Sequence, residues 1–281
     1  MRKLISALIL LTVVSISAVG QNNVLDGAYV HENAPTLNVV PYPYLRESDV
    51  MWSKMVWRVI DLSEKLNLPL KYPTRPIRNR KSLINVLVDG MKEGTLTAYS
   101  TVDDEFTTPI TFEGVQKKFG ASLDTQIVVD PDPPYASHET VVAKDANYDK
   151  VIGYRIKEEW FFDKQRSVMD VRIIGIAPIV YDEDEFGNIR ESGQRKALLW
   201  VYFPEARTML VNAECFNLEN DAERRTFDDI FMKRIFSTTI IKVSNVYDRN
   251  IGDYRTGIDA LLESNKLKAD IFNLEHDLWE Y

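Results

Sequence analysis

The sequence predicts an α+β fold, in which an antiparallel meander sheet is flanked by N-terminal and C-terminal helices. Two observations lead to this prediction. Residues 151–180, VIGYRIKEEWFFDKQRSVMDVRIIGIAPIV, contain two β-rich runs joined by polar residues, a pattern typical of a hairpin. Segments with helical periodicity lie on both sides of it, at 47–66 and 82–94 before the hairpin and at 226–236 and 267–278 after it.

The first twenty residues predict a cleaved secretory signal. Arg2 and Lys3 precede an apolar run that ends at Ile16, and small residues lead up to Gly20 and Gln21, between which we expect cleavage. A membrane-anchoring N-terminus is the alternative, although the run is short for a membrane span. No cysteine follows the expected cleavage position, so we expect an exported, soluble protein without an N-terminal lipid anchor.

The composition narrows the class of protein further. The chain has 281 residues and a formal charge of −8, which the loss of the signal makes more negative. Such a chain is not expected to bind nucleic acid or anionic lipid through its bulk charge. Its single cysteine, Cys215, cannot form an internal disulfide, so packing must supply the stability.

After the signal, residues 21–46 predict an extended arm, because three prolines and spaced aromatic residues disfavour a helix. The remaining residues, 47–281, are predicted to form a single α+β domain. The chain would thus consist of the signal at 1–20, the arm at 21–46 and this domain.

The domain is predicted to open with a helix over 47–66, ESDVMWSKMVWRVIDLSEKL. At 100° per residue, Trp52 falls on a broad apolar side and Trp57 falls among the polar residues. Trp57 would therefore cover something besides the core of its own helix, either another segment of this chain or another protein. A second helix is predicted to begin after Ser82 and to stop at Gly94.

The hairpin has a predicted register, set by the turn at Asp163 to Arg166. It places one set of side chains on an apolar face: Tyr154, Ile156, Trp160, Met169, Val171 and Ile173. A second, polar set lies on a face exposed to water: Arg155, Lys157, Glu159, Asp170 and Arg172. A third strand, KALLWVYF at 196–203, is apolar on both sides, which favours a central place in the sheet.

Beyond Pro204 the pattern is helical again. Thr226 and Asp229 resemble a capping box before FDDIFMKRIF. The last helix carries apolar residues at spacings of four and three, which predicts that it packs along the domain or a partner: Leu267, Ile271, Leu274 and Leu278.

Neither a metal site nor a nucleophilic site is predicted. His31, His138 and His276 are scattered, and the residue four positions after His138 is valine, so a zinc-protease pair is incomplete. The loop at 182–193 lacks two ligand positions of a calcium loop, and Cys215 is expected to be a buried small hydrophobe. We therefore expect no cofactor and no enzyme activity.

Glu158 is the one residue that looks out of place, because the predicted register points it to the apolar face between Ile156 and Trp160. A carboxylate beside an indole is a candidate general acid, which leaves a cell-wall-glycan binding module or hydrolase as the alternative function. An ion pair with an arginine is the other interpretation of the same residue.

Four segments resemble the GldN family of gliding motility proteins, called PorN in non-gliding relatives. They are VPYPYLRESDVMWSKMVWRVIDLSEKLNLPL, VIGYRIKEEWFFDKQRSVMDVRIIGIAPI, WVYFPEARTMLVN and RRTFDDIFMKRIFSTTIIKVSNVYDR. The resemblance covers nearly the whole chain after the signal and rests on whole segments, with no catalytic motif among them.

The resemblance implies a periplasmic structural component of the type IX secretion system of Bacteroidetes, which exports proteins across the outer membrane and is coupled to gliding. It further implies a ring-like complex with an outer-membrane lipoprotein, GldK or PorK, self-association within that ring, and contact with the motor protein GldM or PorM. The membrane would be reached only indirectly, through the lipoprotein. Tyr42, Tyr44 and Trp57 are the candidate partner contacts, because such side chains often anchor interfaces.

Overall fold

The computed structural model describes residues 37–279, except 78–79, 103, 130–136, 184–188, 191–192, 218 and 221. The residues from Asn38 onward form one compact unit. The predicted signal, its cleavage position at Gly20 and Gln21, and most of the predicted arm lie outside the described residues, as does most of the loop at 182–193.

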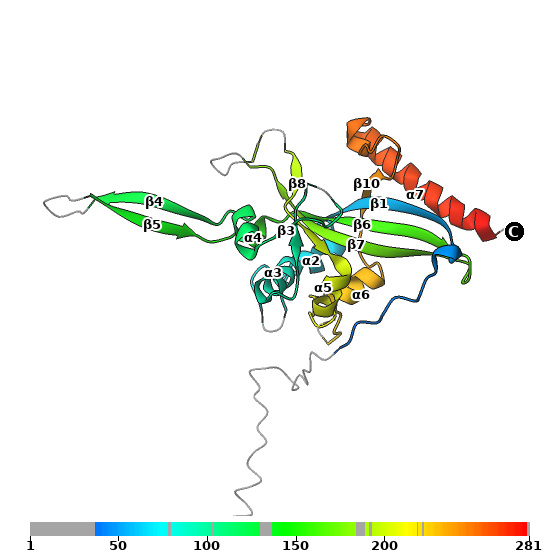
Figure 1. Cartoon of the computed structure of the whole chain (residues 1–281), viewed down its shortest axis with the longest axis horizontal. Helices are drawn as coiled ribbons and strands as arrows, with labels where there is room; N and C mark the ends of the chain where they lie inside the picture. Colours follow the sequence, from blue (N-terminus) through cyan, green and yellow to red (C-terminus); the bar gives the residue numbers. More distant parts are fainter. Residues whose placement is uncertain are drawn as a thin grey trace, which may run out of the picture. The chain divides into compact units, whose positions relative to one another are not determined.

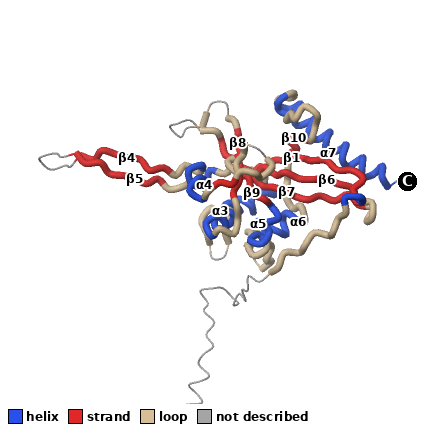
Figure 2. Tube along the Cα trace, viewed as in Figure 1, coloured by secondary structure: helices blue, strands red, loops and turns tan. Residues whose placement is uncertain are grey.

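The core element is an antiparallel sheet of eight strands, coloured red in Figure 2. Its order is β10-β1-β6-β7-β9-β2-β3, and β8 also pairs with β7. The strands are β1 (Val50–Asp61), β2 (Ala98–Tyr99), β3 (Pro109–Ile110), β6 (Gly153–Asp163), β7 (Val168–Tyr181), β8 (Arg195–Ala197), β9 (Trp200–Tyr202) and β10 (Thr239–Val243). A separate two-stranded sheet pairs β4 (Ser122–Val129) with β5 (Ser137–Lys144).

Helices lie between these strands and after the last of them, so the predicted α+β class is confirmed (Figure 1). They are α2 (Leu68–Lys71), α3 (Leu83–Glu93), α4 (Phe112–Lys118), α5 (Phe203–Leu210), α6 (Phe227–Met232) and α7 (Gly257–Trp279). Short 3-10 segments occupy Glu47–Asp49, Lys65–Asn67, Tyr148–Lys150 and Ile251–Asp253.

The helix predicted at 47–66 is wrong, because this segment forms β1 between β10 and β6. The apolar residues on which the prediction depended lie four apart, and a spacing of four keeps side chains on one face in a helix and in a strand alike. Val56 and Ile60 are fully buried in β1, and a helix would have buried the same two side chains, so their apolar character does not tell a helix from a strand. Trp52 and Trp57 differ by five positions, an odd spacing that places them on opposite faces of the strand.

The predicted hairpin is confirmed as β6 and β7, and the predicted register holds in its outer part. Trp160 lies opposite Val171, and Glu159 lies opposite Arg172. A bulge next to Glu158 shifts the pairing, so that Ile156 lies opposite Ile176.

The second face of this hairpin is not freely exposed, contrary to the prediction. Lys157 and Phe161 on that face are 9% and 2% exposed. Gly175, opposite Lys157, permits the close approach of Phe106, whose ring atoms lie 2.4 Å from where a Cβ would stand. A loop from outside the hairpin therefore covers a face that local alternation marks as polar.

The predicted third strand is divided in two. β8 pairs with the end of β7, whereas β9 lies between β7 and β2, so only the second half takes the predicted central place. Trp200 and Val201 of β9 are 3% and 0% exposed. The chain then enters α5 at Phe203, where Pro204 occupies a helix-starting position that needs no backbone donor.

The other predicted helices are confirmed, with changes at their ends. Gly94 ends α3 in the left-handed conformation, with φ 76°. The capping box of Thr226 and Asp229 starts α6, which ends at Met232 because Arg234 takes a positive φ of 53° and turns the chain. These helices bury one main core cluster with the inner residues of the sheet.

The C-terminal helix α7 packs against β10, the edge strand that sequence reasoning missed. Leu267 and Ile271 of α7 join a second apolar cluster with Val56 of β1. The backbone N–H of Ile240 donates to Ser264 Oγ of α7 at 2.9 Å. A helix side chain therefore occupies one of the backbone donors on the outer edge of β10. The opposite edge strand, β3, has two residues and contains Pro109, which has no N–H to donate.

Candidate interaction surface

Glu158 lies at the centre of a buried ion-pair cluster on the first face of the sheet. Its side chain is 0% exposed and accepts a hydrogen bond from Trp160 Nε1 at 3.0 Å. Arg58 Nε of β1 lies 3.2 Å from Oε2, and Arg234 Nη2 lies 3.0 Å from Oε1. Both guanidinium groups also stack on the Trp160 ring, at 5.1 and 5.3 Å from its centroid. We name these four residues the arginine cluster.

The chemistry of the arginine cluster is that of charge compensation. Burial lowers the pKa of Arg58, and the nearby Glu158 carboxylate opposes that effect. The Glu158 side chain has no exposed surface, and each of its carboxylate oxygens lies beside an arginine, so a glycan cannot reach it in this conformation. The arrangement agrees with the ion-pair interpretation of this residue.

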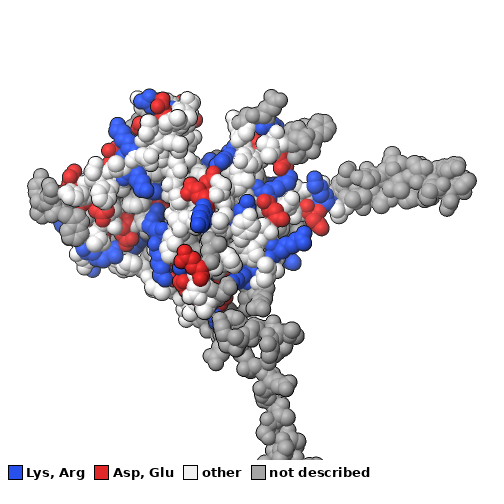
Figure 3. Space-filling model, turned by 180° about the vertical axis from the view of Figure 1, so that it is seen from behind, with Lys and Arg blue, Asp and Glu red and all other residues white. Residues whose placement is uncertain are grey.

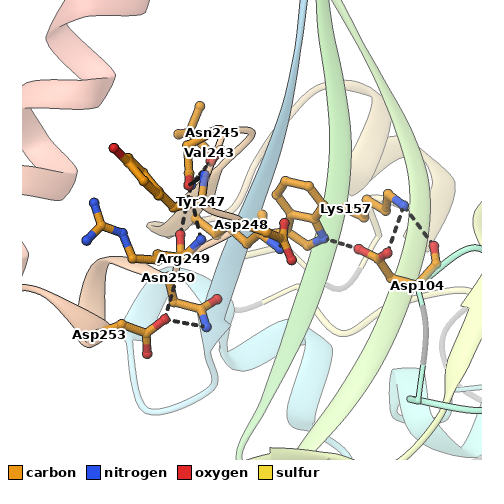
Figure 4. A network of polar contacts seen from close by, with 11 residues as sticks. Asp104, Lys157, Val243, Asn245, Tyr247, Asp248, Arg249, Asn250 and Asp253 are labelled. Carbon is orange, nitrogen blue, oxygen red and sulfur yellow. Dashed lines mark hydrogen bonds and ion pairs between the residues drawn. The ribbon is translucent and has the colours of Figure 1, made fainter.

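Trp57 lies at the centre of a second network, on the opposite face of the same strands. Its Nε1 donates to Asp104 Oδ2 at 2.7 Å, and the ammonium groups of Lys157 and Lys242 lie 5.6 and 4.5 Å from its ring centroid. Lys157 also donates to the Asp104 carbonyl oxygen at 2.7 Å, as Figure 4 shows. We name Trp57, Asp104, Lys157 and Lys242 the lysine cluster.

The loop after β10 is tied to this lysine cluster and is held by its own hydrogen bonds (Figure 4). Lys242 pairs with Asp248 at 2.5 Å. Asn245 accepts from the backbone N–H groups of Tyr247 and Arg249, both at 3.1 Å, and donates to the Val243 and Arg249 carbonyl oxygens. A loop with this many internal bonds keeps a defined shape, and it is a place where function often resides.

The loop and the start of α7 present large apolar side chains to solvent. We name them the apolar surface: Val246, Tyr247, Tyr254, Ile258, Leu261 and Leu262, of which Val246 is 97% exposed. The Arg249 guanidinium stacks on Tyr247 and Tyr254, at 4.5 and 5.4 Å from the ring centroids, and joins the loop tip to the segment before α7. In α7 the stripe packed inward contains Ser264, Leu267 and Ile271, so Leu261 and Leu262 are apolar residues that the fold leaves uncovered. Exposed apolar residues that lie together often mark contact sites, whereas single ones are common on any protein surface.

The two tyrosines of the predicted contact set differ in their surroundings. Tyr42 is half-buried, and its ring lies 5.2 Å from the guanidinium carbon of Arg172 and 4.7 Å from that of Arg207. Burial raises the pKa of the Tyr42 hydroxyl. Tyr44 is 85% exposed. The structure does not bring Tyr42 and Trp57 into one cluster, since each has separate intrachain partners.

The described residues offer little for covalent or metal chemistry. Burial raises the pKa of the Cys215 thiol to about 11, which leaves it protonated at neutral pH. Within the described part of the chain, no group of three or more His, Cys, Asp or Glu side chains is placed to hold a metal ion. Likewise, none of the described helices is long and apolar enough to cross a membrane. On the face seen in Figure 3, the described acidic and basic side chains are interspersed.

The fold and these surfaces define a class of protein: an α+β protein with ordered polar networks and a solvent-facing apolar surface, suited to binding other macromolecules. The family model described as "Gliding motility associated protein GldN" matches residues 45–280. The chain therefore belongs to the GldN family and is a component of the gliding motility and type IX secretion machinery. No curated protein matches the chain in sequence.

Sequence reasoning missed the apolar surface, although a signal for it was present. Ile258, Leu261 and Leu262 have the spacing of one helix face, but they lie outside the stripe that begins at Leu267. Two apolar stripes on one helix indicate two neighbours. Recognising both stripes in the sequence of α7 would have predicted one side of the helix packed on the domain and a second side left exposed.

Proposed function

We propose that this chain is a periplasmic structural subunit of the type IX secretion and gliding machinery, required for protein secretion across the outer membrane. It forms a ring-like complex with copies of itself and with an outer-membrane lipoprotein, GldK or PorK, and it contacts the motor protein GldM or PorM. Family membership and the predicted export signal without a lipidation cysteine support this proposal. In it, the chain reaches the outer membrane only through its lipoprotein partner.

The observation that carries the interaction role is the apolar surface on an internally bonded loop. A rigid loop loses little conformational entropy when it binds, so its exposed tyrosine and valine side chains are well suited to an interface. Tyr44, Tyr42 and Trp57 remain proposed partner contacts. Tyr44 has the largest exposed area of the three, whereas Tyr42 and Trp57 would contribute their outward edges while keeping their intrachain contacts.

The experiment compares two charge substitutions at exposed apolar residues. The first is Leu262→Glu, at a residue of the apolar surface whose side chain is 60% exposed. The control is Val102→Glu, at a residue outside that surface whose side chain is 91% exposed. Mature wild-type and variant proteins are titrated against the purified lipoprotein and, separately, the motor protein's periplasmic part. We expect Leu262→Glu to weaken at least one interaction by about tenfold or more, the size of a modest hot spot, and Val102→Glu to leave both within about twofold.

The same variants are then tested for secretion in cells and for retention of the protein with outer membranes. Secretion and retention should fall together in Leu262→Glu. Equal binding by both variants would remove the apolar surface from the proposal, and retention that persists after deletion of the lipoprotein would contradict the proposed anchoring.

A further inference from the structure

A cleft of about 410 Å³ lies beside the arginine cluster, between α7 and the sheet. Arg58, Arg234 and Lys268 contribute three cations to its lining, and Glu275 contributes a carboxylate. Glu275 stands two helical turns along α7 from Lys268, and Glu158 is buried behind the two arginines. The lining therefore carries an excess of positive charge in a chain whose formal charge is −8.

The arginine cluster fixes the two guanidinium groups before any ligand arrives. Arg234 has a positive φ of 53°, and its side chain is held by Glu158 and by stacking on Trp160 and Phe236. A non-glycine residue in this backbone region is strained by about 1–2 kcal/mol, and such strain often accompanies a functional position. Its Nη1 is buried and has no hydrogen-bond acceptor among the described residues, whereas the Arg234 side chain as a whole is 27% exposed and contributes its positive charge to the cleft lining. A side chain held in this way loses little rotamer entropy on binding.

Lys268 supplies the third cation from α7. It is exposed, and no carboxylate of the described residues pairs with it. The cleft also has an apolar rim, because Leu66 and Phe272 line it and are 52% and 66% exposed. A small inorganic anion would satisfy the cations and leave these two side chains uncovered.

We propose that this cleft binds a peptide segment of a partner protein in which acidic and large apolar side chains alternate. Its carboxylates pair with Lys268 and the Arg234 guanidinium, and its apolar side chains cover Leu66 and Phe272. The site is separate from the apolar surface and does not depend on which assembly the chain joins.

The test uses two fluorescent probe peptides, Ac-Leu-Asp-Phe-Glu-Leu-NH₂ and its uncharged analogue Ac-Leu-Asn-Phe-Gln-Leu-NH₂, titrated into the mature protein. We expect the acidic peptide to bind at least about fivefold more tightly, with an advantage that shrinks as salt rises, because partly exposed charge pairs are screened. Inorganic phosphate should compete only weakly, since it cannot cover the apolar rim.

Matched variants on α7 localise the binding. Lys268→Glu should weaken binding of the acidic peptide by about fivefold or more, whereas Lys266→Glu, at a lysine that is also exposed but lies outside the lining, should leave binding within about twofold. Phe272→Ser should weaken both peptides, and Ile258→Ser should not. Equal binding of the two peptides, equal effects of the two lysine variants, or no binding at millimolar peptide would overturn the proposal. Unchanged thermal midpoints of the exposed-site variants would show that the fold is intact.

Discussion

The arginine cluster and the lysine cluster contain the same kinds of parts on opposite faces of β1 and β6. Each has one tryptophan, two cations and one carboxylate that accepts the indole N–H. They differ in burial, because the Glu158 side chain is 0% exposed and the Asp104 side chain is 34% exposed. They also differ in their cations, since arginine forms planar, directional contacts and lysine provides a mobile point charge.

Burial gives the two clusters different consequences for the fold. A buried carboxylate must be matched by cations, and removing either partner leaves an uncompensated charge in a poor solvent. An exposed carboxylate can be solvated when a partner is lost, so its loss has a small effect. We therefore expect the arginine cluster to maintain the fold and the lysine cluster to adjust the position of the loop beside it.

The largest expected effect comes from Glu158→Gln, which leaves Arg58 and Arg234 facing each other without a counter-charge. Such a change costs about 3 kcal/mol in the free energy of unfolding and lowers the thermal midpoint by roughly 6–12 °C. Urea unfolding followed by circular dichroism measures it. Glu159→Gln, one residue along on the other face, is the control and should stay within about 0.5 kcal/mol of wild type. Similar losses for the two variants would break the comparison.

An intermediate effect is expected at the turn that both faces share. Asp163 accepts from Arg166 Nε at 2.6 Å, and this hydrogen bond holds the pKa of the carboxyl below its usual value. A pKa that is lower in the folded state contributes stability above the unfolded value of about 4 and loses it as the pH falls through the folded pKa. Asp163→Asn should therefore lower the midpoint at pH 7 and flatten its fall from pH 5 to pH 2. A fall as steep as that of wild type would contradict this.

A smaller effect is expected for Asp104→Asn in the lysine cluster. It removes a partly exposed carboxylate that interacts with Lys157 and Trp57, which should cost about 1 kcal/mol. The loss should shrink at 0.5 M salt, where exposed pairs are screened. Unfolding at low and high salt measures this. A cost as large as that of Glu158→Gln would mean that burial does not separate the two clusters.

The smallest effect on stability is expected for Tyr44→Ala, because the side chain is 85% exposed. Its thermal midpoint should match that of wild type, whereas Tyr42→Ala should lose about 1 kcal/mol of cation–π contact with Arg172 and Arg207. If Tyr44 contacts a partner, binding to the lipoprotein should weaken while the midpoint does not move. An unchanged affinity would remove Tyr44 from the proposed contacts.

Local sequence patterns were sufficient for elements whose signals lie within a few residues. The hairpin followed from alternation around Asp163, the start of α6 from Thr226 and Asp229, and the end of α3 from Gly94. The prediction for the β1 segment was wrong because a spacing of four fits both the helical and the strand period. Only the pairing of this segment with two distant strands decides between them. β10 has five residues, TIIKV, whose apolar side chains and burial do not alternate, so no period of two marks it as a strand.

The arginine cluster and the lysine cluster could not be predicted from local sequence patterns. Glu158 could be recognised as misplaced from the hairpin register, but its partner Arg234 lies 76 positions away. Trp57 could be recognised as a second, unexplained tryptophan, but Asp104 lies 47 positions away and belongs to an irregular loop. Long-range pairs of this kind depend on the packing of the whole sheet, which no short window contains.

The two ends of the sheet limit how copies of this chain can grow into larger structures. At one end Ser264 occupies the N–H of Ile240, and at the other Pro109 has no donor to offer. At these two edges an incoming strand would find no continuous row of free backbone groups, so strand addition to the eight-stranded sheet is disfavoured. Association at this sheet is then left to side chains, and an interface built from side chains can close an assembly at a fixed number of subunits.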